Sequence, residues 1–150
     1  MKAVRVLEYG GQMVSNDVPT PTIARDEILV KIKSTAVNHV DLVKASGTAR
    51  QVLPIELSWI PGHEFSGVVE EIGGDVTTYA PGDAVFGRSS TGTLAEYTRA
   101  PADNFAPKPT SMPWSVQWAT DIVATWPDDP RQAVPDPTST EDIVHRAAAA

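Results

Sequence analysis

The chain has 150 residues, a mass of 16.1 kDa and a formal net charge of −7, which is the size of one ordinary domain. A composition of 41% hydrophobic and 21% charged residues is typical of globular proteins and excludes wholesale disorder. The acidic balance argues against a nucleic-acid partner, and no apolar run reaches the roughly 18 residues that a membrane span needs. The absence of cysteine excludes disulfides, thiolate zinc ligands and cysteine nucleophiles. Because no signal-peptide core is present at the N-terminus, we expect a cytoplasmic protein.

The first three quarters of the chain predict short strands separated by Gly and Pro turns. Apolar or alternating segments predict strands over 1–9, 27–37, 67–73, 84–86 and 94–98. A short helix is expected over 41–46. Many short strands with tight turns are typical of a partly open β-barrel or a sandwich, so we expect a mainly β (α+β) fold.

The composition changes after Met112. All ten glycines lie at or before Gly92, whereas residues 113–150 hold five of the thirteen prolines and three of the four tryptophans. We therefore expect one domain over residues 1–112 and an atypical tail over 113–150. Within the tail, the sequence predicts a helix over 113–126, then irregular chain, and a last short helix over 140–150.

Five motifs occur in one order along the predicted β domain. They are VNHVDL (37–42), IPGHEFSGVVEEIG (60–73), YAPGDAVFG (79–87), GTLAEYT (92–98) and APKP (106–109). Together they resemble the N-terminal, chaperonin-10-like (alcohol dehydrogenase-like) domain of the medium-chain dehydrogenase/reductase family. The branch that they resemble most is the zinc-independent quinone oxidoreductases. The resemblance implies a chaperonin-10-like, partly open β-barrel and, at the family level, NAD(P)H-dependent reduction of quinones, enones or other carbonyl compounds.

The same resemblance indicates how this chain departs from the zinc-dependent branch. Asn38 stands where that branch has a cysteine ligand, and a further cysteine ligand has no counterpart here. His63, followed by Glu64, aligns with the metal-binding histidine, and Asp41 aligns with the carboxylate that orients it. Because a neutral amide is a poor zinc ligand, we expect no metal.

In the quinone oxidoreductase branch the resemblance implies a different use for these positions. Asn38 and Asp41 are the predicted catalytic residues: the Asn38 amide would donate to a substrate carbonyl or to the cofactor, and Asp41 would orient it or pair with His63. Asn38, His39 and Lys44 are predicted on the nicotinamide side of a cofactor site, with His63 and Glu64 behind them. Three alternatives stay open, one of which is that His39 and Lys44 are ordinary surface residues. Asn38 and Asp41 could cap the helix that follows, and His63 could simply hydrogen-bond Asp41, with Glu64 solvated or paired.

A hydride-transfer enzyme of this family also needs a dinucleotide-binding Rossmann domain. The 150 residues contain no Gly-x-Gly-x-x-Gly, and residues 113–150 are too few for such a domain. We therefore expect no Rossmann domain and no tight NADP(H) binding by this chain alone, although its full-length relatives use NADP(H). Three hypotheses follow: a truncated or single-domain family member that is inactive alone, a non-catalytic binding or interaction module, and one subunit of a split oxidoreductase whose partner supplies the cofactor domain. The expected substrate is a small carbonyl or quinone molecule, and the expected protein partner is either a second copy of the chain or a separate cofactor-domain protein.

Overall fold

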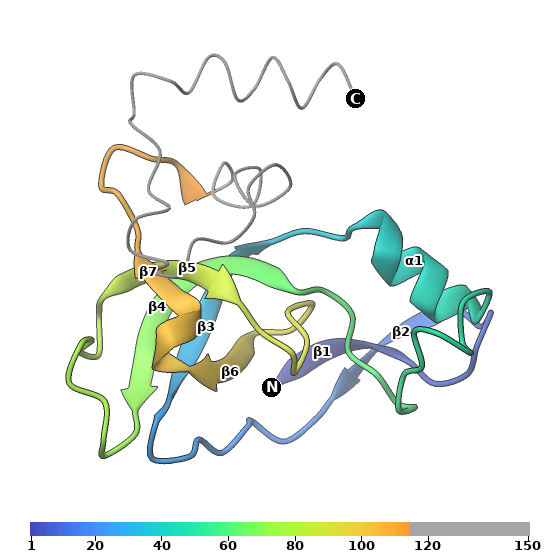
Figure 1. The fold of residues 1–150 in the computed structure, drawn as a ribbon, viewed down its shortest axis with the longest axis horizontal. Helices are drawn as coiled ribbons and strands as arrows, with labels where there is room; N and C mark the ends of the chain where they lie inside the picture. The colour runs from blue at the N-terminus through green and yellow to red at the C-terminus, as the bar shows by residue number, and fades with distance from the viewer. Residues whose placement is uncertain (115–150) are drawn as a thin grey trace.

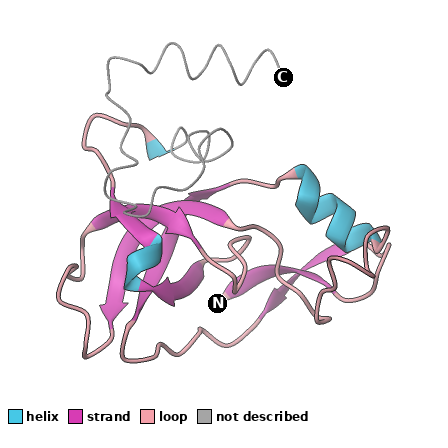
Figure 2. Cartoon of the chain, in the orientation of Figure 1, coloured by secondary structure: helices cyan, strands magenta, loops and turns pink. Residues whose placement is uncertain are grey.

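The computed structural model describes residues 1–114, which form seven strands, one α-helix and one short 3-10 helix (Figure 2). Their order is β1 (Lys2–Val6), β2 (Met13–Asp17), β3 (Glu27–Thr35), α1 (His39–Ser46), β4 (Glu64–Ile72), β5 (Ala84–Arg88), β6 (Tyr97–Pro101), η1 (Ala102–Asn104) and β7 (Phe105–Pro107). No helix within these residues is long and apolar enough to cross a membrane. Of the predicted tail, 113–150, only Pro113 and Trp114 are described. The predicted helix 140–150, and the predicted helix 113–126 from residue 115 on, therefore lie outside the described residues.

The strands form two antiparallel sheets. The larger has the order β6-β3-β4-β5-β7, and the smaller pairs β1 with β2 (Figure 1). Isolated bridges, Ala3 to Ala95 and Val6 to Trp59, join β1 to the segments that precede β6 and β4. Figure 1 shows the larger sheet curling, with α1 beside the turn between β1 and β2. The predicted mainly β, partly open barrel is therefore confirmed for the described residues.

The core is formed by the larger sheet and one adjoining turn. Its buried residues come from β3, β4, β5, β6 and β7 and the turn after β4, namely Ile28, Val30, Phe65, Val69, Val76, Val85, Ala100 and Phe105. The rings of Phe65 and Phe105 pack edge to face, with centroids 5.5 Å apart, an arrangement that aromatic quadrupoles favour. This contact links the beginning of β4 to β7 across the intervening strand β5, and it helps to position the residues that precede Phe65.

The observed elements differ from the predicted ones mainly at their ends. The helix begins at His39, two residues before the prediction, because Asn38 is its N-cap. The predicted strand 94–98 is displaced: β6 begins at Tyr97, since the preceding residues instead bond to β1 (Val4 N to Leu94 O, 2.8 Å). Strands β2 and β7 were not predicted at all.

Candidate functional site

The site begins at the N-terminus of α1, where Asp41 is completely buried. Its Oδ2 accepts the backbone N–H of Asn38 at 2.8 Å, which caps the helix. Its Oδ1 accepts the backbone N–H of Gly62 at 3.1 Å. Asp41 therefore joins the start of the helix to the turn that precedes β4.

The turn at Pro61 and Gly62 approaches the segment before β6 closely. The Pro61 carbonyl accepts the N–H groups of Thr93 (3.0 Å) and Leu94 (2.9 Å). Gly62 has a φ of 90°, and a Cβ added there would lie 2.3 Å from Thr93 Oγ1. Only glycine fits both the conformation and the space, and the turn presents the next residue, His63, at a fixed position.

The imidazole of His63 lies between a cation and a carboxylate. Its Nε2 is 3.0 Å from Lys44 Nζ and 3.7 Å from Asp41 Oδ1. Lys44 Nζ also lies 5.6 Å from the centre of the Trp59 ring, within range of a cation–π contact. The backbone carbonyl of His63 accepts the N–H of Ser89 at 2.8 Å, which ties it to the residue after β5.

Glu64, the first residue of β4, is buried and paired on both oxygens. Oε2 accepts a hydrogen bond from Asn38 Nδ2, and Oε1 lies 3.6 Å from the guanidinium of Arg88. The alternative in which Glu64 is solvated is therefore wrong, and the alternative in which it is paired agrees with the structure. The cluster thus contains two carboxylates, Asp41 and Glu64, and two cations, Lys44 and Arg88, so their formal charges cancel.

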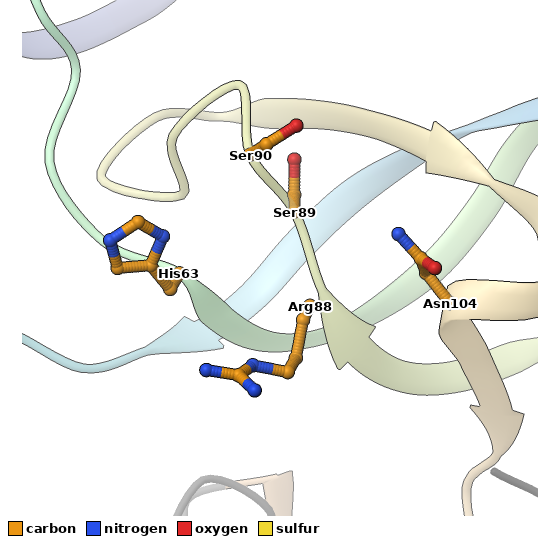
Figure 3. Close-up of a pocket in the computed structure, with 5 residues that line it drawn as sticks. All are labelled: His63, Arg88, Ser89, Ser90 and Asn104. Atoms are coloured by element: carbon orange, nitrogen blue, oxygen red, sulfur yellow. The ribbon is translucent and has the colours of Figure 1, made fainter. Parts of the chain in front are cut away.

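A cavity of about 420 Å³ opens beside the cluster, lined by His63, Arg88, Ser89, Ser90 and Asn104 (Figure 3). Asn104 reaches the cavity because η1 passes directly over Gly87 in β5. A Cβ added to Gly87 would lie 2.2 Å from the Asn104 carbonyl oxygen. In Figure 3, His63 and Asn104 lie on opposite sides of Ser89. The volume is within the range of small-molecule sites and suits a compound of one or two rings.

The structure brings five of the six predicted site residues together in one cluster: Asn38, Asp41, Lys44, His63 and Glu64. The sixth, His39, is exposed on the first turn of α1 and makes no hydrogen bond or ion pair with them in the described part of the chain. Four lining residues were not predicted, namely Arg88, Ser89, Ser90 and Asn104. The one local signal was an arginine directly after the apolar run of β5.

Comparison with known proteins gives one family for most of the described residues. The sequence profile of the alcohol dehydrogenase GroES-like domain matches residues 24–110. The quinone oxidoreductase of Pongo abelii is 37% identical over 105 residues, which are 67% of this chain and 31% of that protein. The chloroplastic quinone-oxidoreductase QR1 of Triphysaria versicolor is 35% identical over 103 residues, 65% of this chain and 31% of that protein. The chain thus spans about a third of the length of these relatives.

Solved structures give the same result at the level of the fold. An alcohol dehydrogenase superfamily protein from Novosphingobium aromaticivorans superimposes with a TM-score of 0.75 at 29% identity, over 91% of this chain and 43% of that one. The quinone oxidoreductase from Coxiella burnetii gives 0.71 at 26% identity, over 79% and 40%. The mycobacterial protein Rv1454c, solved as a complex with NADPH, gives 0.71 at 32% identity, over 79% and 37%.

Proposed function

Since the chain belongs to the medium-chain dehydrogenase/reductase family, as a carrier of its N-terminal alcohol dehydrogenase GroES-like domain, we propose that it forms the substrate-binding part of an NAD(P)H-dependent oxidoreductase. The substrates are quinones, enones or related carbonyl compounds, the reaction uses no zinc, and the protein is cytoplasmic. One observation carries the proposal: the matched range 24–110 contains every side chain of the cluster and of the cavity. The relatives named as quinone oxidoreductases supply the substrate class, and the NADPH complex of a similar structure supports the cofactor.

The chemical role that we propose for Asn38 follows from its hydrogen bond to Glu64. An amide nitrogen has two N–H groups, and the bond to Glu64 uses one and orients the other. A carbonyl compound that accepts hydride develops negative charge on its oxygen. A fixed N–H beside that oxygen stabilises the charge, and removing one such donor costs about 100-fold to 1,000-fold in rate. Asp41 is the positioning residue that fixes the backbone of Asn38.

NAD(P)H, when bound, supplies the hydride. A cavity of about 420 Å³ has room for the nicotinamide end of a dinucleotide but not for the whole molecule. We place Asn38, His39 and Lys44 on the nicotinamide side and propose that residues beyond the described 1–114 hold the rest of the cofactor. Those residues belong either to the same polypeptide or to a separate partner subunit. A non-catalytic binding module is the second candidate function, because the described residues provide a cavity of about 420 Å³ but no Gly-x-Gly-x-x-Gly motif.

The test measures cofactor binding and reduction separately. Titration calorimetry of the 150-residue chain with NADPH is expected to show no micromolar binding, and the chain with NADPH and a naphthoquinone to show no NADPH oxidation. Adding the protein encoded directly downstream, or by a neighbouring frame with a Gly-x-Gly-x-x-Gly motif, is expected to start the oxidation.

In that assembled enzyme, Asn38→Ala is expected to lower the rate by about 100-fold. Val37→Ala, an exposed neighbour, serves as the matched control. Micromolar NADPH binding by the lone chain would contradict the proposed division of the cofactor site. An unchanged rate in Asn38→Ala would contradict the role of the amide, and no oxidation in any combination would favour the binding module.

A further inference from the structure

The contact between Lys44 and His63 determines which nitrogen of the imidazole carries the proton. A lysine ammonium has three donors and no acceptor, so at 3.0 Å it must donate to Nε2 of the ring. A neutral imidazole that accepts at Nε2 carries its proton on Nδ1. Lys44 thereby fixes the tautomer of His63.

The neighbouring carboxylate does not compete for the same nitrogen. Asp41 Oδ1 lies 3.7 Å from Nε2, beyond the range of a hydrogen bond. Both oxygens of Asp41 already accept backbone N–H groups, from Asn38 and Gly62. Lys44 Nζ also lies 5.6 Å from the centre of the Trp59 ring, so a cation–π contact adds to its interaction with the imidazole.

These residues do not fit the zinc ion of the zinc-dependent alcohol dehydrogenases. A zinc ion bound by His63 would need the lone pair of a ring nitrogen at about 2.0–2.1 Å. The lone pair on Nε2 is engaged by Lys44, and the tautomer that this contact fixes has a proton on Nδ1. The amide of Asn38, at the position of the first ligand, donates to Glu64 and so points an N–H rather than a lone pair into the cluster. Among residues 1–114, no group of three or more His, Asp or Glu side chains is placed to hold a metal.

We propose that the Lys44 ammonium, by engaging Nε2 of His63, prevents this ring from acting as a metal ligand and makes it a hydrogen-bond donor through Nδ1. The ring lines the cavity, and Nδ1 makes no hydrogen bond to any residue of the described part of the chain. Its N–H is therefore free to bind the oxygen of a carbonyl ligand. The statement about the metal stands on the geometry alone, whereas the statement about the ligand rests on the proposed function.

The first experiment reads the tautomer directly. The 150-residue chain is labelled with 15N-histidine, and the His63 signals are assigned with His63→Gln and recorded at mildly alkaline pH, where a free imidazole is neutral. We expect a protonated Nδ1 and an unprotonated Nε2 in the wild type, and a shift toward protonated Nε2 in Lys44→Met. The exposed Lys33→Met is the matched control and should match the wild type. A protonated Nε2 in the wild type, or no change in Lys44→Met, would overturn the proposal.

The second experiment asks whether Lys44 excludes a metal. Asn38→Cys returns the first ligand, and Asn38→Cys/Lys44→Met also removes the cation. Co²⁺ binding is measured by the thiolate-to-cobalt absorption band. We expect the double variant to bind Co²⁺ at least about tenfold more tightly than Asn38→Cys does, a difference of about 1.4 kcal/mol. Equal affinity in the two variants would overturn the proposal, and so would one equivalent of Zn²⁺ that raises the wild-type Tm and is lost in His63→Gln.

A third experiment tests whether the Nδ1–H of His63 binds the oxygen of a carbonyl ligand. Addition of 2-cyclohexenone is expected to shift the His63 Nδ1 signal in the wild type and to shift it less in Lys44→Met. An unchanged wild-type signal would overturn this part while leaving the result on the metal intact. None of these measurements requires NADPH oxidation, so a failure of the proposed oxidoreductase activity is recognised separately.

Discussion

Asp41 shows how one side chain can position a whole site. It is completely buried, and its two oxygens accept backbone N–H groups that lie on either side of the cluster, one at the start of α1 and one at the turn before His63. A buried carboxylate is tolerated only when its hydrogen-bonding capacity is satisfied, and here two backbone donors do so. The residue that holds the helix in place also holds the histidine turn.

Replacing Asp41 with asparagine tests this arrangement. An amide has one acceptor oxygen, so one of the two backbone N–H groups would face an NH2 group and lose its partner. We expect Asp41→Asn to lower the free energy of unfolding by about 1–3 kcal/mol, measured by urea denaturation. The exposed Asp26→Asn is the control and should stay within about 0.5 kcal/mol of the wild type. Equal stability of the two variants would show that Asp41 does not join these segments.

At the scale of elements, an ion pair connects the edge strand β6 to its neighbour in the larger sheet, β3. Arg99 of β6 donates to both oxygens of Glu27, the first residue of β3, and the Glu27 carboxylate also accepts the backbone N–H of Ala24 at 2.9 Å. The hydrogen bond from Ala24, followed by Arg99, holds the pKa of Glu27 below its ordinary value of about 4.5, against an opposing effect of burial. A carboxyl with a lowered folded-state pKa stabilises the fold above the unfolded-state pKa, and this contribution is lost as the pH falls through the folded-state value.

Glu27→Gln should therefore be less stable than the wild type at about pH 7, and the difference should shrink as the pH falls below the ordinary glutamate pKa of about 4.5 and through the lower folded-state pKa of Glu27. The measurement is the urea midpoint across this range. Glu70→Gln, at an exposed position of β4, is the control and should not reproduce the pH-dependent difference. A difference between Glu27→Gln and the wild type that does not vary with pH would contradict the ionic origin of the effect.

Those elements that bury a regular apolar pattern were predictable from the sequence. The predicted strands 27–37 and 84–86 correspond to β3 and β5. Both were predictable because alternating or continuous apolar residues between turn residues favour a strand over a helix or a loop. Strand β2, with the sequence MVSND, was missed since no residue of it is fully buried and only pairing with β1 defines it. β7 is only three residues long, and its pairing with β5 comes from closure of the sheet rather than from its own sequence.

The candidate site divides in the same way. Asn38, Asp41, His63 and Glu64 were found because they lie in two short motifs, and family resemblance gave them roles. Asn104 could not be found from the sequence, because it reaches the cavity only where η1 crosses Gly87. The bond from Lys44 to His63 joins residues 19 positions apart, so it depends on the way α1 docks against the turn before β4.

At the scale of the whole described structure, strand β1 is paired along both of its edges. Strand β2 covers one edge, and along the other Val4 N–H and Val6 N–H donate to Leu94 and Trp59, each at 2.8 Å. Trp59 returns a bond to Val6 at 3.1 Å, and Val6 is completely buried. Because β1 is hydrogen-bonded on both edges, we expect the small sheet not to unfold independently. Strand β1 also helps to hold Trp59 beside Lys44.

Hydrogen exchange of the 150-residue chain can show whether the two sheets open together. Because β1 is bonded on both sides, we expect Val4 and Val6 amides to open with free energies within about 1 kcal/mol of the central amides of β3, through global unfolding. Amides of β2 serve as the internal control and should exchange faster, since β1 is the only strand that β2 pairs with in the described residues. If Val4 and Val6 instead exchanged as fast as β2, the β1–β2 sheet would open on its own, and Trp59 would then lose its support against Lys44 without unfolding of the larger sheet.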